Sequence, residues 1–218
     1  MKPDNMIPSH HPSDALLIDY AAGSLEPGRL LILGVHLGAC AACRDVVALA
    51  ESVGGALLCE LPAAEMAPDA LARAMARIER PPAPSQAPNA TTPQDWIRVP
   101  ADVALAAKRH RRWAAPGVWV APVSGRARGP RSYLLRVGAG MSVPRHTHAG
   151  VELICVLKGA YTDRGEIHGP GDFAENDDTV EHTPRVTADG ECICLIAADN
   201  ALIPRDWVGR LFQPLVGI

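Results

Sequence analysis

Hydrophobic positions in the first 80 residues recur at helical spacing. Apolar side chains follow Ser13, whose hydroxyl suits the N-cap of a first helix, at Leu16, Leu17, Tyr20, Ala21 and Leu25. A second helix is expected from Pro27, a third over 42–53 up to a Gly-Gly pair, and a fourth over 69–80. Four short helices poor in aromatic residues predict a thin bundle, which gains much of its stability if it binds a metal.

The pattern changes after a proline-rich segment, residues 81–97. Proline removes backbone donors and blocks helix formation, so this segment is interpreted as an extended linker. Beyond it, short apolar runs separated by Gly, Pro and Asp predict strands at Val118–Val123, Ser132–Val137, Val151–Leu157 and Cys192–Ala197. Many short strands with turn signals are typical of a sandwich or barrel. The sequence therefore predicts an α+β protein of two domains, a helical domain over 1–80 and an all-β domain over 98–218.

Composition indicates the class of protein and the cellular compartment to expect. Hydrophobic residues make up 48% of the chain and charged residues 21%, which is enough apolar content for buried cores. No apolar run approaches the roughly 18 residues of a membrane helix, and the polar N-terminus does not resemble a signal peptide. We therefore expect a cytoplasmic protein without membrane contact. Its six cysteines should then be reduced, which favours metal or redox chemistry over disulfides.

The first candidate metal site is formed by His36, Cys40 and Cys43, in an H-x3-C-x2-C pattern. On a helix these offsets fall on one face, and imidazole with thiolate is the ligand set that zinc prefers. A tetrahedral site needs a fourth ligand, and the remaining candidates before the linker are His10, His11 and Cys59. His11 is favoured, because packing the first helix on the second would bring it toward His36. The alternative, three small buried core residues without a metal, is weaker because the spacing matches a ligand set.

The second candidate metal site contains His146, His148 and Glu152, in the pattern G-x5-H-x-H-x3-E-x6-G. Histidines two apart in a strand point to the same face. His182 is the expected fourth ligand, although His168 is a rival because it lies nearer the Gly-Pro-Gly-Asp turn. Three imidazoles and a carboxylate suit a divalent metal: zinc first, with iron, manganese or nickel as alternatives. The spacing matches the first motif of the cupin superfamily, which implies a double-stranded β-helix, or jelly-roll, barrel.

Cys192 and Cys194 form a C-x-C pair in a strand-like run. Same-face neighbours in a strand stand about 6.5–7 Å apart, too far for an unstrained disulfide. Small buried core residues are the simpler interpretation, and a redox-responsive pair near the metal is the alternative.

Two stretches, HHPSDALLIDYAAGSL and HLGACAACRDVVALAESVGGALL, resemble the cupin-containing zinc anti-sigma factors of the ChrR family. The resemblance covers nearly the whole chain, and His11, His36, Cys40 and Cys43 match the four zinc-ligand positions of such domains. It implies a non-enzymatic regulator whose helical domain sequesters an extracytoplasmic-function sigma factor in a 1:1 complex. It also implies that the cupin responds to an oxidative signal, such as singlet oxygen, in a stress response.

Charge agrees with a protein partner. Residues 1–80 contain six Lys or Arg and ten Asp or Glu, a net charge of −4, which suits a basic DNA-binding protein and disfavours direct DNA binding. A zinc-containing DNA-binding regulator is therefore the weakest alternative. A dioxygenase-like cupin metalloenzyme with an accessory zinc domain is the stronger one, because cupin barrels also serve as enzyme scaffolds. A four-ligand site, however, leaves less room for substrate than an open triad does.

Overall fold

The structure, a computed structural model, describes residues 7–80, 95–109, 111–125, 131–200 and 203–204. Five helices are present in these ranges: α1 (Asp14–Ala21), α2 (Pro27–Ala39), α3 (Ala41–Cys59), α4 (Ala70–Ile78) and α5 (Ala101–Arg109). The order of helices first and strands afterwards confirms the predicted α+β class. Most of the predicted linker, 81–94, lies outside the described residues. None of the described helices is long and apolar enough to cross a bilayer.

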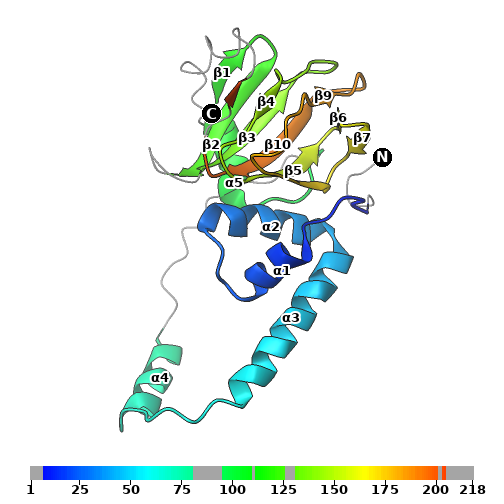
Figure 1. Ribbon diagram of the computed structural model, residues 1–218. Helices are drawn as coiled ribbons and strands as arrows, with labels where there is room; N and C mark the ends of the chain where they lie inside the picture. The colour runs from blue at the N-terminus through cyan, green and yellow to red at the C-terminus, as the bar shows by residue number, and fades with distance from the viewer. Residues whose placement is uncertain (1–6, 81–94, 110, 126–130, 201–202, 205–218) are drawn as a thin grey trace.

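The strands form antiparallel sheets that face each other (Figure 1). The large sheet has the order β1 (Arg112–Ala115), β2 (Val118–Gly125), β3 (Arg131–Val137), β10 (Cys192–Ala198), β5 (Glu152–Lys158) and β8 (Phe173–Asn176). A three-stranded sheet has the order β7 (Glu166–His168), β6 (Tyr161–Asp163) and β9 (Arg185–Val186). A two-stranded sheet pairs β11 (Ile203–Pro204) with β4 (His146–Thr147). The four strands predicted from sequence correspond to β2, β3, β5 and β10.

Both faces of the large sheet are covered. Along β10, Cys192, Cys194 and Ile196 face the interior between the sheets, and Ile193 and Leu195 join the core on the opposite face. That opposite face is covered by helices, and α2 lies directly across it (Figure 1). Because water is excluded from both sides, every residue of β10 is buried.

The helical region is held against the sheet rather than apart from it. Ile32 and Leu33 of α2 belong to the same core cluster as Leu153 of β5 and Leu195 of β10. Gly28, in the first turn of α2, lies so close to the sheet that a Cβ there would sit 2.5 Å from the Ser132 hydroxyl. α1, α2, the start of α3 and α5 therefore share one continuous core with the β-domain.

Two helix predictions were wrong. The third helix was expected to stop at Gly54-Gly55, but α3 continues through both glycines to Cys59. Gly costs a helix about 1 kcal/mol relative to Ala, and the Ala and Leu residues that follow are strong helix formers. The four helices were also expected to pack as one bundle, but α4 stands away from the other helices (Figure 1), with none of its residues buried.

Candidate metal centres

The helical cluster brings together the four residues expected from the sequence. His11 precedes α1, His36 lies in the last turn of α2, and Cys40 and Cys43 lie at the start of α3. The His11 Nδ1 atom is 3.4 Å from each sulfur, and the His36 Nε2 atom is 3.3 Å from the Cys43 sulfur. In a tetrahedral zinc site, Zn–S bonds of about 2.3 Å and Zn–N bonds of about 2.0 Å place neighbouring ligand atoms about 3.5 Å apart. The cluster therefore has the dimensions of a zinc site.

The surroundings of this cluster fix which atoms are available to a metal. His36 is fully buried, and its Nδ1 lies 2.7 Å from the carbonyl oxygen of Gly171, so Nδ1–H donates and the Nε2 lone pair faces the cluster. Burial lowers the pKa of His36 and raises the pKa of the Cys43 thiol to about 12. The imidazole is thus neutral, as a ligand must be. A thiol so costly to ionise becomes a thiolate only beside a strong positive charge, which zinc would supply.

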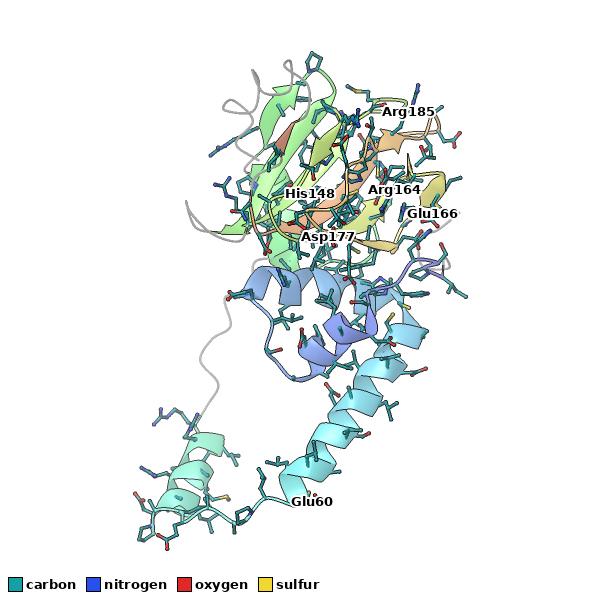
Figure 2. The ribbon with its side chains drawn as sticks, viewed as in Figure 1. Glu60, His148, Arg164, Glu166, Asp177 and Arg185 are labelled. Carbon is teal, nitrogen blue, oxygen red and sulfur yellow. The ribbon has the colours of Figure 1, made fainter. Side chains whose placement is uncertain are left out.

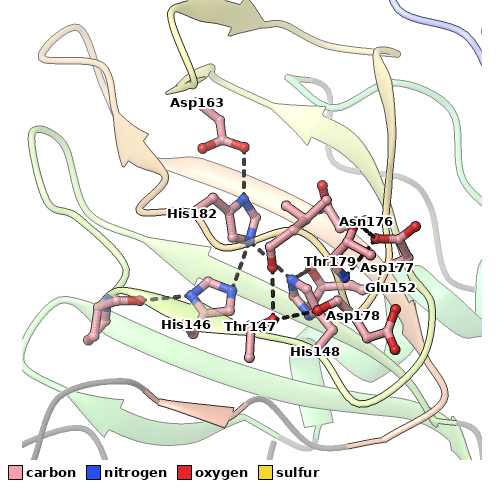
Figure 3. A network of polar contacts seen from close by, with 12 residues as sticks. His146, Thr147, His148, Glu152, Asp163, Asn176, Asp177, Asp178, Thr179 and His182 are labelled. Atoms are coloured by element: carbon pink, nitrogen blue, oxygen red, sulfur yellow. Dashed lines mark hydrogen bonds and ion pairs between the residues drawn. The ribbon is translucent and has the colours of Figure 1, made fainter.

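The second cluster lies between the sheets of the β-domain and is completely buried (Figure 3). His146 comes from β4, His148 from the loop after it, Glu152 from the start of β5, and His182 from the segment before β9. The Nε2 atoms of His146 and His148 lie 3.0 and 3.2 Å from Nε2 of His182, and Glu152 Oε2 is 3.6 Å from His148 Nε2. Four ligand atoms therefore converge on one point.

Two histidines of this cluster are oriented by hydrogen bonds from their Nδ1 atoms. His182 Nδ1 donates to Asp163 Oδ2 at 2.8 Å, and His146 Nδ1 donates to the Pro144 carbonyl at 2.7 Å (Figure 3). These two bonds use the Nδ1 proton of each ring and leave Nε2 as the atom that faces the cluster. The two Nε2 atoms lie 3.0 Å apart, close enough for one cation to be bound by both. This arrangement fits a divalent metal, because metal-binding histidines usually donate their other ring N–H to a carboxylate or a backbone carbonyl.

Burial sets the charge of the cluster. It lowers the pKa of His146 and of His148 to about 4 and raises the pKa of Glu152 to about 8. Asn176 opposes that rise by hydrogen-bonding Glu152. Neutral imidazoles are competent ligands, and a bound cation would keep Glu152 ionised.

His182, and not its rival His168, completes this cluster. His168 lies on β7 and belongs to a separate group with His10 and Glu166. Asp163 and Asn176, which support the cluster, were not identified from the sequence. They lie on β6 and β8, and no spacing in the chain links them to the histidine motif.

A cavity of about 50 Å³ adjoins the buried cluster. Its walls are mostly apolar, and they include His146, Glu152, His182 and both residues of the C-x-C pair. The Cys192 and Cys194 sulfurs lie 3.7 Å apart, closer than the strand spacing suggested, because the two side chains lean toward each other. The C-x-C pair is thus both buried and next to the metal-ligating residues.

The helical cluster and the β-domain are directly connected. Besides the His36 bond to Gly171, Arg29 of α2 donates to both oxygens of Asp199, at 2.7 and 2.8 Å. Asp199 also accepts from the backbone N–H of Val151, the residue before Glu152. The same carboxylate therefore contacts a helix of the first site and the backbone beside the second.

Comparison with known proteins agrees with this architecture. The family model described as the ChrR cupin-like domain matches residues 97–200. The anti-sigma-E factor ChrR of Cereibacter sphaeroides is 35% identical over 216 residues, covering 96% of this chain and 98% of the relative. This chain belongs to the ChrR family. The predicted cupin barrel and the predicted resemblance are both confirmed.

A solved structure extends the match to both parts of this ChrR-family chain. The crystal structure of Rhodobacter sphaeroides SigE in complex with the anti-sigma ChrR aligns with a TM-score of 0.73 and 34% identity. The alignment covers 88% of this chain and all of the matched chain. The helical region and the cupin therefore occur together in a relative seen with its sigma factor.

Proposed function

We propose that this ChrR-family protein is a cytoplasmic anti-sigma factor that regulates transcription in an oxidative stress response. Its helical domain, residues 1–80, would sequester an extracytoplasmic-function sigma factor in a 1:1 complex, without binding DNA itself. Its cupin, residues 98–218, would release the sigma factor on an oxidative signal such as singlet oxygen. The protein would act by binding and not as an enzyme. The relative crystallised with SigE supports the choice of partner.

The observation that carries this proposal is a set of exposed apolar side chains on α3 and α4 that no described part of the chain covers. Beyond its first two turns, α3 exposes Leu49, Val53, Leu57 and Leu58, the last two at 61% and 68% exposure. α4 exposes Leu71, Met75 and Ile78, which recur at helical spacing along one face. Large apolar side chains grouped on extended helices mark a protein-binding surface. In Figure 1 these two helices project away from the cupin, where a partner can reach them.

Two metals would serve this function. Zinc held by His11, His36, Cys40 and Cys43 would join the start of α1 to the junction of α2 and α3. Bound there, zinc would cross-link these helices and add to the folding stability of a domain that is small for its own hydrophobic core. A second divalent metal, zinc first, with iron, manganese or nickel as alternatives, would be held by His146, His148, Glu152 and His182.

The cupin is placed to influence the helices through the contacts it makes with α2. A change at Glu152 would move the backbone at Val151 and so the Asp199 carboxylate that binds Arg29. Release requires two states in which the helical domain has different affinities for the sigma factor. The shared core and the Arg29–Asp199 pair supply an interface that can differ between those states.

The direct test is co-purification. The tagged full-length protein, expressed in its own host, should capture a sigma factor identified by mass spectrometry, and the purified pair should be 1:1. Transcription in vitro by polymerase holding that sigma factor should stop when the protein is added. Recovery of the protein without any sigma factor, under conditions where it is folded and metal-loaded, would refute the proposal.

A further inference from the structure

A third group of metal-ligating side chains lies outside both sites described above. It forms where the segment before α1 passes β7, and Figure 2 labels Glu166 at this edge of the cupin. Glu166 and His168 stand two residues apart on β7 and so share a face, and His10 reaches them from the N-terminal segment. One ligand atom from each of the three residues lies within 4.8 Å of the other two.

His168 has an unmet bonding requirement. Its side chain is 5% exposed, and its Nδ1 atom has no hydrogen-bond partner among the residues that the structure describes. The ring is held in place by Tyr161, on which it stacks with centroids 4.8 Å apart and planes 10° apart. A buried nitrogen without a partner is uncommon, because it has given up its bonds to water. A bound ion is one way to meet that requirement.

His10 is oriented like a metal ligand. Asp172 accepts backbone N–H groups from Ser9 at 2.6 Å and from His10 itself at 3.0 Å, which fixes this stretch of chain on the cupin. The same carboxylate lies 3.3 Å from His10 Nδ1, which leaves Nε2 directed at Glu166, 3.6 Å away. In metal-binding histidines, the ring nitrogen that does not bind the metal commonly contacts a carboxylate, which fixes the orientation of the ring.

We infer that His10, Glu166 and His168 form a third metal site, for a divalent first-row ion such as zinc. Two imidazoles and a carboxylate suit zinc, with water completing a four-coordinate shell. Ligand atoms around such an ion stand about 3.3 Å apart, so the group must contract on binding. Glu166 is exposed and can turn inward without disturbing the core.

This site would tie the N-terminal segment to β7. The next residue, His11, belongs to the helical cluster, so an ion bound to His10 would link that cluster to the cupin by a second route. With three protein ligands and an exposed edge, the site should exchange its ion more readily than the two sites with four protein ligands. It would make the contact between the helical region and the cupin dependent on free metal.

The test uses full-length protein that already carries its resident metals. Equilibrium dialysis against buffered zinc should show one further equivalent bound in the micromolar range. The His168→Phe variant should lose that equivalent, because phenylalanine keeps the stack on Tyr161 but offers no nitrogen. Glu166→Gln, at an exposed position that does not threaten folding, should weaken it at least about tenfold.

A matched control and a second readout separate this site from adventitious binding. Asp189→Asn removes an exposed carboxylate outside the three clusters and should leave zinc uptake unchanged. Zinc should also slow hydrogen exchange at the amides of Ser9 and His10 in the wild type and not in Glu166→Gln. Uptake of no further zinc by the wild type, or equal uptake by wild type and both site variants, would overturn the inference. These measurements do not involve a sigma factor, so they stand apart from the proposed function.

Discussion

At the scale of single residues, both predicted metal centres depend on the histidine nitrogen that faces away from the ion. His36 donates to Gly171, His146 to Pro144 and His182 to Asp163, so in each ring Nε2 is the atom left for a metal. Sequence spacing predicted six of the eight candidate ligands, because ligands close in sequence follow helical or strand periodicity. The other two, His11 and His182, were chosen among rivals by the expected packing of the first helix and by their place relative to a turn. The supporting atoms could not be predicted, since each comes from a distant part of the chain or from the backbone.

The cysteine pair of the helical site gives the first residue-scale prediction. Each chain should bind two tightly held metals, and Cys40→Ser with Cys43→Ser should lose about one zinc while the cupin metal remains. The helical region should also lose circular dichroism signal, because structural zinc supplies much of the folding energy of such small domains. Metal analysis by mass spectrometry checks the first point.

The control for that variant is Cys59→Ser, which removes an exposed cysteine at the end of α3 that belongs to no metal-ligating cluster among the described residues. It should keep both metals. Unchanged zinc content in the Cys40 and Cys43 double variant would contradict the assignment of the helical site.

Gly159, at the end of β5, gives a second residue-scale prediction. Its φ is +71°, and a Cβ there would lie 2.1 Å from the backbone oxygen of Glu191. Gly159→Ala should therefore lower the free energy of unfolding of the cupin by about 2–4 kcal/mol, measured by chemical denaturation. Gly190→Ala is the matched control, because nothing lies within 4 Å of its Cβ position, and it should change stability little. Equal effects of the two changes would contradict this account of the turn.

At the scale of elements, the four predicted strands match the structure to within two residues at each end, whereas the shorter strands of the described ranges were not predicted. The central strands of the large sheet are apolar runs bounded by turn residues, and that local signal suffices to place them. α5 was missed, because Val103 and Leu105 are its only large apolar residues, too few to show a helical period, and its packing depends on β2 and β3. α4 was predicted as a helix, but its position was not, since its apolar face finds no partner within the described part of the chain.

The exposed apolar residues of α3 and of α4 carry the prediction at this scale. Leu57→Glu and Ile78→Glu, each placing a charge on an exposed apolar position, should weaken sigma-factor binding at least tenfold, which is about 1.4 kcal/mol. The melting temperature should hardly change, because neither side chain is buried in the free protein. Binding is measured by titration calorimetry or surface plasmon resonance.

Ile167→Glu serves as the control for these two variants. Ile167 is an equally exposed apolar residue, at 61%, but it lies on β7 of the cupin. It should leave sigma-factor binding unchanged. If all three variants bind alike, the contact surface lies elsewhere on the molecule.

At the scale of the whole molecule, the helical region and the cupin share a core that the sequence did not reveal. A proline-rich segment between two differently patterned halves suggested independent domains. Contacts such as α2 against β5 and β10 depend on three-dimensional packing and leave no local pattern beyond an apolar helix face. The helical domain can therefore carry the inhibitory surface and still depend on the cupin for stability.

This shared core shapes the behaviour of the isolated helical domain. A fragment of residues 1–85 should bind and inhibit the sigma factor, because α3 and α4 are retained whole. It should be less stable than the full chain, since removal of the cupin exposes Ile32 and Leu33, which are fully buried in the full-length protein. Thermal melting and sigma-factor binding of the fragment check both points. A zinc-loaded, folded fragment that fails to bind would mean that the inhibitory unit is wrongly drawn.

The proposed signal response is the property that would need both halves of the molecule. His146→Ala with His148→Ala should remove the cupin metal, keep sigma-factor binding, and abolish release by the oxidative stimulus. The reason is spatial: three of the four ligands, His146, Glu152 and His182, line the cavity proposed to admit a small oxidant, whereas the helices proposed to bind the sigma factor lie beyond the other face of the sheet. Release is followed as the loss of the 1:1 complex in gel filtration after exposure to singlet oxygen.

A second pair of changes then locates the oxidised group. Cys192→Ser with Cys194→Ser removes the two sulfurs that stand 3.7 Å apart beside the same cavity. If these thiols take the oxidation, the variant should bind metal and the sigma factor normally but fail to release it. Normal release would assign the response to the metal-ligating residues alone. If the His146 and His148 variant also releases the sigma factor normally, the sensor lies outside the cupin cavity, and the thiolates at Cys40 and Cys43 become the groups to test.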